Sequence, residues 1–167
     1  MAETLSVSGN TKEAKYQSLV VAVASLMQGE SNVIANMANA TAAIKEVFGF
    51  LWVGFYLVEG EELVLGPFQG PVACCRIKKG RGVCGVSWEK GEVIVVPDVE
   101  AFAGHIACSS KSKSEIVVPV YGNNEITGVL DIDSECLNCF DEIDAKYLSA
   151  IADLFAAKHA DDAYLRD

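Results

Sequence analysis

The sequence predicts a single α+β domain in which helices near both ends of the chain pack on a mainly antiparallel sheet. Apolar residues recur at helical spacing near both termini, whereas the middle of the chain has short β-branched and aromatic runs joined by tight turns. Such segregation of helices from strands is typical of the α+β class. The 167 residues suit one domain, and no repeat or linker divides them. We expect residues 1–10 to be a flexible tail and residues 11–167 to be that domain.

Two helices are expected in the amino-terminal part of the chain. The first covers about residues 12–28, and Gly29 is expected to end it. Ser31 or Asn32 would then cap the second helix, which stops before Gly49. The apolar residues that recur at helical spacing in these two segments are Tyr16, Leu19, Val20, Val23, Leu26, Val33, Ile34, Met37, Ala40, Ile44 and Val47.

Strands are expected to follow. They cover residues 50–58, 61–65, 72–77, 93–96, 116–121 and 126–132. Tight turns at Glu59-Gly60 and at residues 122–125 would make two of the pairs into hairpins. Residues 80–88 are expected to form a loop with one helical turn, and a last helix is expected over about residues 141–163. The region from 66 to 115 is poor in regular structure, which is where functional loops tend to lie.

The charge balance excludes several classes of partner. Thirteen Lys and Arg residues stand against 23 Asp and Glu residues, for a formal net charge of −10. Nucleic acids and anionic membranes favour clustered basic residues, so we expect neither as a partner. No stretch approaches the roughly 18 apolar residues of a spanning helix, and the first residues do not resemble a signal peptide. We therefore expect a cytoplasmic protein.

Six cysteines are the main chemical question of this sequence. They are Cys74, Cys75, Cys84, Cys108, Cys136 and Cys139. In a reducing compartment they do not form a disulfide scaffold, so they are buried apolar residues, metal ligands or redox groups. Each group of them therefore has to be considered in its own surroundings.

Two of the cysteines form a Cys-x-x-Cys motif just before the last expected helix. A thioredoxin-like dithiol needs positive potential at its attacking thiol, but five acidic residues surround Cys136 and Cys139. They are Asp131, Asp133, Glu135, Asp141 and Glu142. A zinc site would need a second ligand pair, and the sequence has no second motif of this kind. A surface loop with two incidental cysteines is the favoured interpretation.

Another cysteine lies inside a glycine-rich motif. Gly80–Gly85 fits the GxGxxG pattern of dinucleotide-binding proteins and includes Cys84. The segment that follows is too short for the crossover helix which that site requires. A tight loop that brings Cys84 close to other backbone is the better interpretation.

Cys108 has the surroundings of a reactive thiol. His105, Lys111 and Lys113 lie nearby in the sequence, and no acidic residue stands between Glu100 and Glu115. Positive neighbours favour the thiolate, which is the nucleophilic form of cysteine. An ordinary loop cysteine beside a surface histidine is the alternative.

Two pairs of residues are candidates for a binding site on the sheet. Asp131 and Asp133 are two apart in an expected strand, so both carboxylates point to one face. They would hold an ammonium group, share a proton as a general acid, or simply be solvated at the strand end. Trp52 and Tyr56 also share a face, although core packing is the usual reason for such aromatics.

Six blocks of this sequence form a specific pattern when they are taken together. They are Gly66–Cys74, Gly80–Gly85, Pro97–Val99, His105–Cys108, Ser114–Pro119 and Gly128–Ser134. Three cysteines, Cys74, Cys84 and Cys108, stand ten and then twenty-four residues apart within them. The pattern resembles that of the free methionine-(R)-sulfoxide reductases, a family of single GAF domains. The resemblance covers roughly residues 15–155, which is nearly the whole chain.

The resemblance implies a GAF-like fold, with a central antiparallel sheet, the N- and C-terminal helices on one face and loops covering a pocket on the other. It also implies reduction of free methionine-R-sulfoxide, with thioredoxin as the reductant, no cofactor, no metal and a homodimer as the suggested assembly. By motif position, Cys108 corresponds to the nucleophile, Cys74 to the main resolving cysteine and Cys84 to a second one. The pocket residues that correspond are Trp52, Tyr56, Glu115, Asp131 and Asp133.

The chemistry of these residues agrees with that reaction. The Cys108 thiolate would attack the sulfoxide sulfur while Glu115 or Asp133 protonates its oxygen, and a neighbouring thiol would convert the resulting sulfenic acid to a disulfide. The remaining carboxylates would hold the free α-ammonium group. Cys75, beside the expected resolving position, and the Cys136–Cys139 pair depart from the family pattern. A GAF module that senses a small ligand without catalysis is the alternative function.

Overall fold

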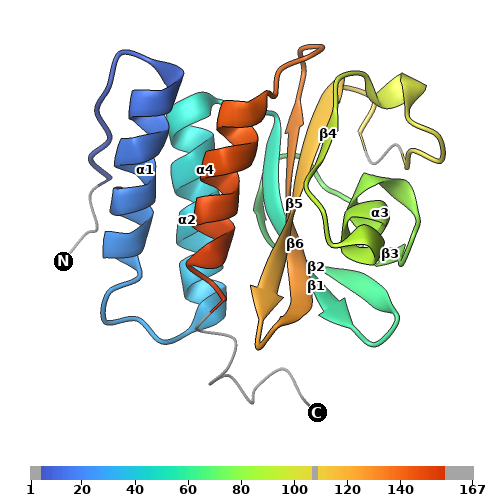
Figure 1. Cartoon of the computed structure of the whole chain (residues 1–167), viewed down its shortest axis with the longest axis horizontal. Helices are drawn as coiled ribbons and strands as arrows, with labels where there is room; N and C mark the ends of the chain where they lie inside the picture. Colours follow the sequence, from blue (N-terminus) through green and yellow to red (C-terminus); the bar gives the residue numbers. More distant parts are fainter. Residues whose placement is uncertain (1–4, 107–108, 157–167) are drawn as a thin grey trace.

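The computed structural model describes residues 5–106 and 109–156, and these form stacked layers of helices and sheet (Figure 1). Two helices pack on one face of a six-stranded sheet and a third helix lies outside them, while a short helix with several loops covers the other face. The elements in chain order are α1 (Lys12–Leu26), α2 (Val33–Phe48), β1 (Trp52–Glu59), β2 (Glu62–Gln69), β3 (Arg76–Lys78), α3 (Gly82–Lys90), β4 (Ile94–Val96), the 3-10 helix η1 (Val99–Ala101), β5 (Ser114–Gly122), β6 (Glu125–Ser134) and α4 (Glu142–Asp153). The predicted α+β class and its antiparallel sheet are confirmed.

The sheet has the strand order β3-β2-β1-β6-β5-β4, and every neighbouring pair is antiparallel. Both predicted hairpins are present, as the pairs β1–β2 and β5–β6. Asn123 and Asn124 connect β5 to β6 with φ of 53° and 64°. Asparagine tolerates this left-handed backbone better than other non-glycine residues, and the hairpin turn requires it. The hairpins leave β1 and β6 adjacent at the centre of the sheet.

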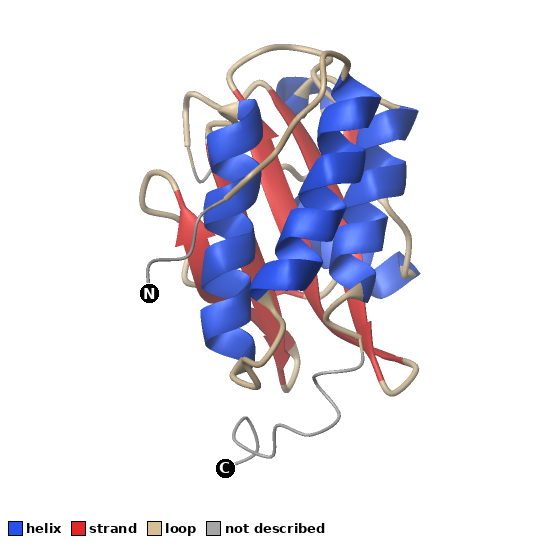
Figure 2. Cartoon of the chain, turned by 90° about the vertical axis from the view of Figure 1, so that its left-hand side faces the viewer, coloured by secondary structure: helices blue, strands red, loops and turns tan. Residues whose placement is uncertain are grey.

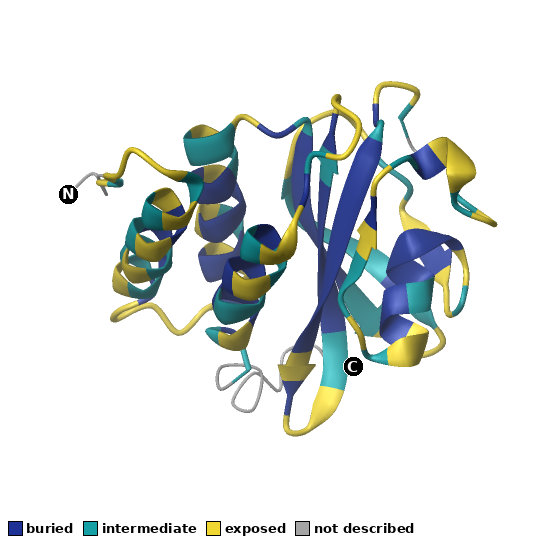
Figure 3. Ribbon diagram, turned by 45° about the horizontal axis from the view of Figure 1, so that its top comes forward, coloured by how far each residue is buried: buried dark blue, intermediate teal, exposed yellow. Residues whose placement is uncertain are grey.

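Helices α2 and α4 lie on one face of the sheet, and α1 packs on both of them on the side away from the sheet (Figure 2). Asn32 caps α2 by accepting a hydrogen bond from Ala35 N at 3.0 Å, and Gly49 ends the helix with φ 68°. The core between helices and sheet is made of apolar residues from all these elements (Figure 3), among them Leu19, Met37, Ile44, Phe55, Ile116, Leu130, Ile132, Leu148 and Phe155. This core fixes which face of the sheet remains for a binding site.

The structure corrects three details of the sequence prediction. Residues 80–88 do not form a loop with a single turn, because α3 is a nine-residue helix. Its glycines lower the intrinsic helix propensity, but the buried Val83, Cys84 and Trp88 pack on the sheet and outweigh that preference. The strand expected over 72–77 is only the three residues of β3, and α4 ends at Asp153, earlier than expected.

A close backbone contact explains one glycine of the GxGxxG pattern. A Cβ atom on Gly85 would lie 2.4 Å from the carbonyl oxygen of Lys78, so no larger residue fits there. The amide of Gly80 donates to the carbonyl of Gly85 at 2.9 Å. The motif is thus a tight connection between β3 and α3, as the sequence interpretation favoured over nucleotide binding.

The amino-terminal residues 5–11 have no regular structure, yet Leu5 and Val7 pack against the helical layer. The division into a tail and one domain stays a prediction. Across the described residues, no helix is long and apolar enough to cross a membrane.

Candidate functional site

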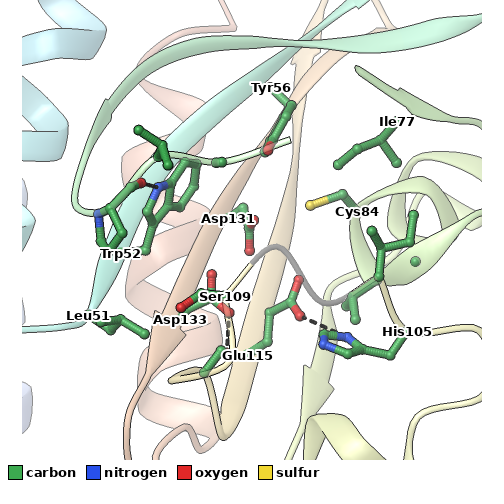
Figure 4. Close-up of a pocket in the computed structure, with 17 residues that line it drawn as sticks. Leu51, Trp52, Tyr56, Ile77, Cys84, His105, Ser109, Glu115, Asp131 and Asp133 are labelled. Atoms are coloured by element: carbon green, nitrogen blue, oxygen red, sulfur yellow. Dashed lines mark hydrogen bonds and ion pairs between the residues drawn. The ribbon is translucent and has the colours of Figure 1, made fainter. Parts of the chain in front are cut away.

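A pocket lies on the face of the sheet opposite the three long helices, between the central strands, α3 and the loops (Figure 4). Six of the seven site residues that the sequence singled out and the structure describes line it: Trp52, Tyr56, Cys84, Glu115, Asp131 and Asp133. The rest of the lining is Leu51, Pro71, Val72, Ala73, Ile77, Gly82, Val83, His105, Ile106, Ser109 and Ser112. The pocket therefore combines acidic, thiol and apolar groups.

Strand register places the acidic residues on one face of the sheet. Asp133 pairs with Trp52 of β1 on one side and with Glu115 of β5 on the other. Asp131 pairs with Gly54, and directly paired residues project to the same face of a sheet. A Cβ atom on Gly54 would lie 2.2 Å from the Trp52 ring, so the glycine leaves room for the indole to lie across the strand. Three carboxyl groups from two strands thus converge beside one aromatic ring.

Two of these carboxyl groups are almost fully buried. Glu115 and Asp131 are each 6% exposed. Burial, with the negative charges of Asp131 and Asp133, raises the pKa of Glu115 well above its usual value. Burial and Asp133 likewise raise the pKa of Asp131, although hydrogen bonds with Cys84 and Glu115 oppose the rise. Asp131 Oδ1 has no hydrogen-bond partner among the described residues, which leaves an acceptor open to a bound cation.

Asp133 lies nearer the mouth of the pocket and is partly exposed. Burial raises its pKa to about 6, and a hydrogen bond from the Ser112 hydroxyl to Oδ1 limits that rise. At pH 7 Asp133 is therefore mostly ionised, whereas burial shifts Glu115 toward its protonated form. The pocket thus holds carboxyl groups that differ in how readily they ionise.

Cys84 enters the pocket from α3 and is 3% exposed. Burial, together with the charges of Asp131 and Glu115, raises the pKa of its thiol well above the usual value. Such a thiol is a poor nucleophile by itself because little thiolate is present. Its surroundings suit a thiol that reacts second, or one that a cation deprotonates.

His105 lies beside the acidic group. Its Nδ1 atom is buried, is 3.9 Å from Glu115 Oε2 and makes no hydrogen bond with any described residue. Burial lowers the pKa of His105, so the imidazole is neutral at pH 7 and the contact with Glu115 is not an ion pair. The His105 imidazole and the Glu115 carboxyl group can therefore each bind a ligand.

The two aromatic residues hold the loop that precedes β3. The Trp52 indole N–H donates to the carbonyl of Pro71 at 3.1 Å, and the Tyr56 hydroxyl donates to the carbonyl of Cys74 at 2.8 Å. The two rings lie 5.9 Å apart and are stacked. Burial raises the pKa of Tyr56 far above its usual value, so it stays a hydrogen-bond donor. Trp52 and Tyr56 thus position Cys74 next to the pocket that they line.

The cysteines have different environments. Cys74 is disulfide-bonded, whereas Cys75 and Cys136 are free and exposed. Cys84 is free and buried, and Cys139 is free and partly buried. Cys108, the predicted nucleophile, lies outside the described residues. The structure therefore describes the acidic cluster and the predicted resolving cysteines, but not the predicted attacking thiol.

Several residues that line the pocket could not be recognised from the sequence. Leu51, Ile77 and Val83 read as ordinary core residues, because nothing in an apolar side chain distinguishes a pocket wall from a core. Ser112 belongs to a polar loop with other serines, and only its bond to Asp133 separates it from them. Spacing along the chain cannot reveal that bond.

Comparison with known proteins gives consistent results over most of the chain. A family described as GAF domain matches residues 32–157. GAF domain-containing protein A of Dictyostelium discoideum is 61% identical over 155 residues, which are 92% of this chain and 98% of that protein. The free methionine-R-sulfoxide reductase of Escherichia coli is 48% identical over 124 residues, covering 74% of this chain and 75% of that protein.

A solved structure is similar over almost its whole length. It is that of free methionine-R-sulfoxide reductase from Neisseria meningitidis in complex with its substrate. The TM-score is 0.93, the sequence identity is 49%, and the match covers 95% of this chain and 96% of that one. The arrangement predicted for a GAF domain is thereby confirmed.

Proposed function

The chain belongs to the free methionine-R-sulfoxide reductase family of GAF domains and is an oxidoreductase, and we propose that it reduces free methionine-R-sulfoxide through a cysteine cycle recycled by thioredoxin. The observation that best supports this activity is the convergence of three carboxyl groups and a buried thiol in one pocket beside Cys74. A GAF module that only binds a ligand needs no such set of thiols.

The carboxyl groups account for the choice of a free amino acid. The α-ammonium group of the substrate would bind Asp133 and the open Oδ1 of Asp131, both on the sheet face of the pocket. Methionine sulfoxide within a polypeptide has an amide in place of that ammonium group and would leave these carboxyl groups unpaired. An unpaired buried charge is costly, so selectivity for the free amino acid has a physical basis.

The reduction itself would begin at Cys108. Its thiolate attacks the sulfoxide sulfur, a carboxylic acid protonates the oxygen, and the oxygen is transferred to cysteine as methionine leaves. We assign the proton donation to Glu115, because burial raises its pKa well above the usual value and favours its protonated form, whereas Asp133 is mostly ionised at pH 7. Trp52 would lie against the methyl-sulfur end of the substrate.

Resolution of the sulfenic acid would fall to Cys74. Its thiol attacks the Cys108 sulfenic acid, water leaves, and a disulfide forms that thioredoxin then reduces. In support, Cys74 is disulfide-bonded while Cys75, Cys84, Cys136 and Cys139 are free. The Tyr56 hydroxyl bound to the Cys74 carbonyl would keep this residue at the pocket rather than Cys75. The buried Cys84 would enter the exchange only as a second resolving thiol.

Thioredoxin-coupled NADPH consumption tests the proposal with the separate R and S epimers of free methionine sulfoxide. We expect turnover of the R epimer, loss of at least about 1000-fold in Cys108→Ser and full activity in the control Cys136→Ser. Cys74→Ser should complete one reduction per protein but fail to turn over. Unchanged turnover in Cys108→Ser would overturn the cysteine assignment. Binding of the substrate without any turnover in the wild type would indicate the sensing module instead.

A cycle that depends on thioredoxin fits a reducing compartment, and we propose the cytoplasm for this protein and a homodimer as its assembly. Cell fractionation and light scattering test these two points. A protein found outside the reducing compartments would contradict the first, and a monomer at cellular concentration would contradict the second.

A further inference from the structure

One cluster in the pocket has the composition of a metal site as well as of an ammonium site. Cys84, Glu115 and Asp131 each present one ligand atom, and these three atoms lie within 4.8 Å of one another. All three residues are buried. In Figure 4 the Cys84 sulfur and the carboxyl groups of Asp131 and Glu115 point into the same space. A thiol from α3 thus meets carboxyl groups from β5 and β6.

Two further atoms of this space are unsatisfied. Asp131 is 6% exposed, and its Oδ1 atom makes no hydrogen bond with any residue that the structure describes. The buried Nδ1 of His105 is in the same condition and lies 3.9 Å from Glu115 Oε2. Buried acceptors are rarely left without a partner unless a ligand supplies one. The cluster therefore has both the ligand types and the vacant acceptors that a cation requires.

We propose that the reduced, substrate-free protein binds one Zn²⁺ ion through Cys84 Sγ, one oxygen each of Glu115 and Asp131, and His105 Nδ1. Tetrahedral zinc with bonds of about 2.0–2.3 Å places its ligand atoms about 3.3–3.8 Å apart, so the cluster has to contract by about 1 Å. His105 Nδ1 lies 3.9 Å from Glu115 Oε2 but outside the 4.8 Å cluster, so the imidazole has to move toward the ion to complete the tetrahedron. These are the nitrogen, oxygen and sulfur ligands that zinc takes in proteins.

The charge balance favours a divalent transition ion over other cations. Zinc binding releases the thiol proton, and the thiolate with two carboxylates then faces two positive charges in a buried space. Magnesium and calcium prefer oxygen ligands, so the sulfur of Cys84 selects against them. An ion at this position would also occupy the side of Asp131 that we assign to the substrate ammonium group. Zinc would then be a reversible competitor of the substrate, a consequence that rests on the proposed function.

Cobalt binding tests the site directly, since a sulfur–cobalt charge-transfer band reports coordination by a thiolate. The protein is reduced, freed of reductant without oxygen and titrated with Co²⁺, and Zn²⁺ is then added to displace it. We expect one equivalent to produce the band in the wild type and in Cys108→Ser, which removes the proposed reductase activity. Cys84→Ser should lose the band and weaken zinc binding by at least about 100-fold, whereas the control Cys136→Ser should retain both.

Two further variants keep the result clear if Cys84→Ser folds poorly. Glu115→Gln should keep the sulfur–cobalt band but weaken zinc binding at least about 10-fold, whereas Glu100→Gln, at an exposed acid, should leave it unchanged. Absence of the band in the wild type, or its loss in Cys136→Ser, would overturn the site. Zinc that binds as expected but does not raise KM for methionine-R-sulfoxide would contradict the proposed position of the substrate, not the metal site.

Discussion

Buried acidic side chains lie on opposite faces of the sheet, and only the one on the helical face is neutralised by its neighbours. On the helical face, Asp144 is fully buried and accepts hydrogen bonds from the Lys12 ammonium group, from the Tyr16 hydroxyl at 2.7 Å and from the Asp141 amide at 2.8 Å. On the pocket face, Asp131 is almost as buried but has an oxygen without any described partner. Among the residues that the structure describes, no lysine or arginine lines the pocket.

The difference separates an acidic group that stabilises the fold from one that awaits a ligand. Asp144 closes a capping box at the start of α4 and joins that helix to α1, so its charge is used within the protein. The pocket carboxyl groups repel one another and are poorly solvated, which costs stability until a cation arrives. A binding site that is destabilised in this way gains affinity for a positively charged ligand.

Removal of the charge on the helical face should give the largest effect. Asp144→Asn leaves the Lys12 ammonium group with one partner fewer and breaks the capping box, so we expect the free energy of unfolding to fall by about 3 kcal/mol. Urea denaturation measures the loss. Asp153→Asn, at an exposed position at the end of the same helix, should change the value by less than about 0.5 kcal/mol. A loss at Asp144 as small as that would contradict its structural role.

The corresponding change in the pocket should have the opposite sign. Asp131→Asn removes a buried group that is repelled by Asp133, so we expect the protein to become about 2 kcal/mol more stable at pH 7 while reductase activity falls. Denaturation and coupled NADPH consumption on the same preparation measure the two changes. If the variant is instead less stable and inactive, Asp131 supports the fold as Asp144 does, and the proposed contrast between the two acids is wrong.

A smaller loss is expected from Tyr16→Phe, which removes one of the three donors to Asp144 without changing a charge. The lost hydrogen bond should lower the free energy of unfolding by about 1 kcal/mol. Tyr121→Phe serves as the matched control, because that hydroxyl donates to Gly91 O at the surface, and we expect less than about 0.5 kcal/mol there. Equal losses in the two variants would mean that burial of Asp144 adds nothing to the bond.

The two faces should also respond to pH in opposite directions. The hydrogen bond from Lys12 lowers the pKa of Asp141, so its contribution is present above pH 3.8 and is lost as pH falls through the lowered value. Burial raises the pKa of Asp133 to about 6, so its contribution is present below pH 3.8 and is lost as pH rises through 6. Denaturation of Asp141→Asn and Asp133→Asn from pH 3 to 7 measures the two differences from wild type. If both differences in the free energy of unfolding change in the same direction with pH, the contrast between the two faces is wrong.

Much of the fold could be read from the chain because local rules agree with the final packing. The hairpin turns, the cap at Asn32 and the end of α2 at Gly49 follow from short-range preferences that the core does not override. The length of helix α3 is not predictable from the chain, because its glycines predict a loop with one helical turn and only the burial of Val83 and Trp88 against the sheet extends the helix to nine residues. Tertiary contacts overrule propensity most easily in such short segments.

The candidate site was partly predictable as well, because the local pattern of one strand agrees with the final structure. A period of two placed Asp131 and Asp133 on one face, and both line the pocket. Nothing in the spacing connected them to Ser112 or His105, which reach the pocket from a long loop. Loop conformations depend on distant contacts, so a chain without regular period offers no basis for placing their side chains.

The sequence by itself determined the class of fold, the residue types of the site and the family resemblance, because these depend on local pattern and on residue identity. Only the tertiary structure decided which buried acid is satisfied and which is open. Asp144 meets Lys12 across more than a hundred residues of chain, whereas Asp131 meets Cys84 and Glu115 instead of a cation. Burial and partnership are properties of atoms brought together by folding, and they set the charge and reactivity of groups that look alike in the sequence.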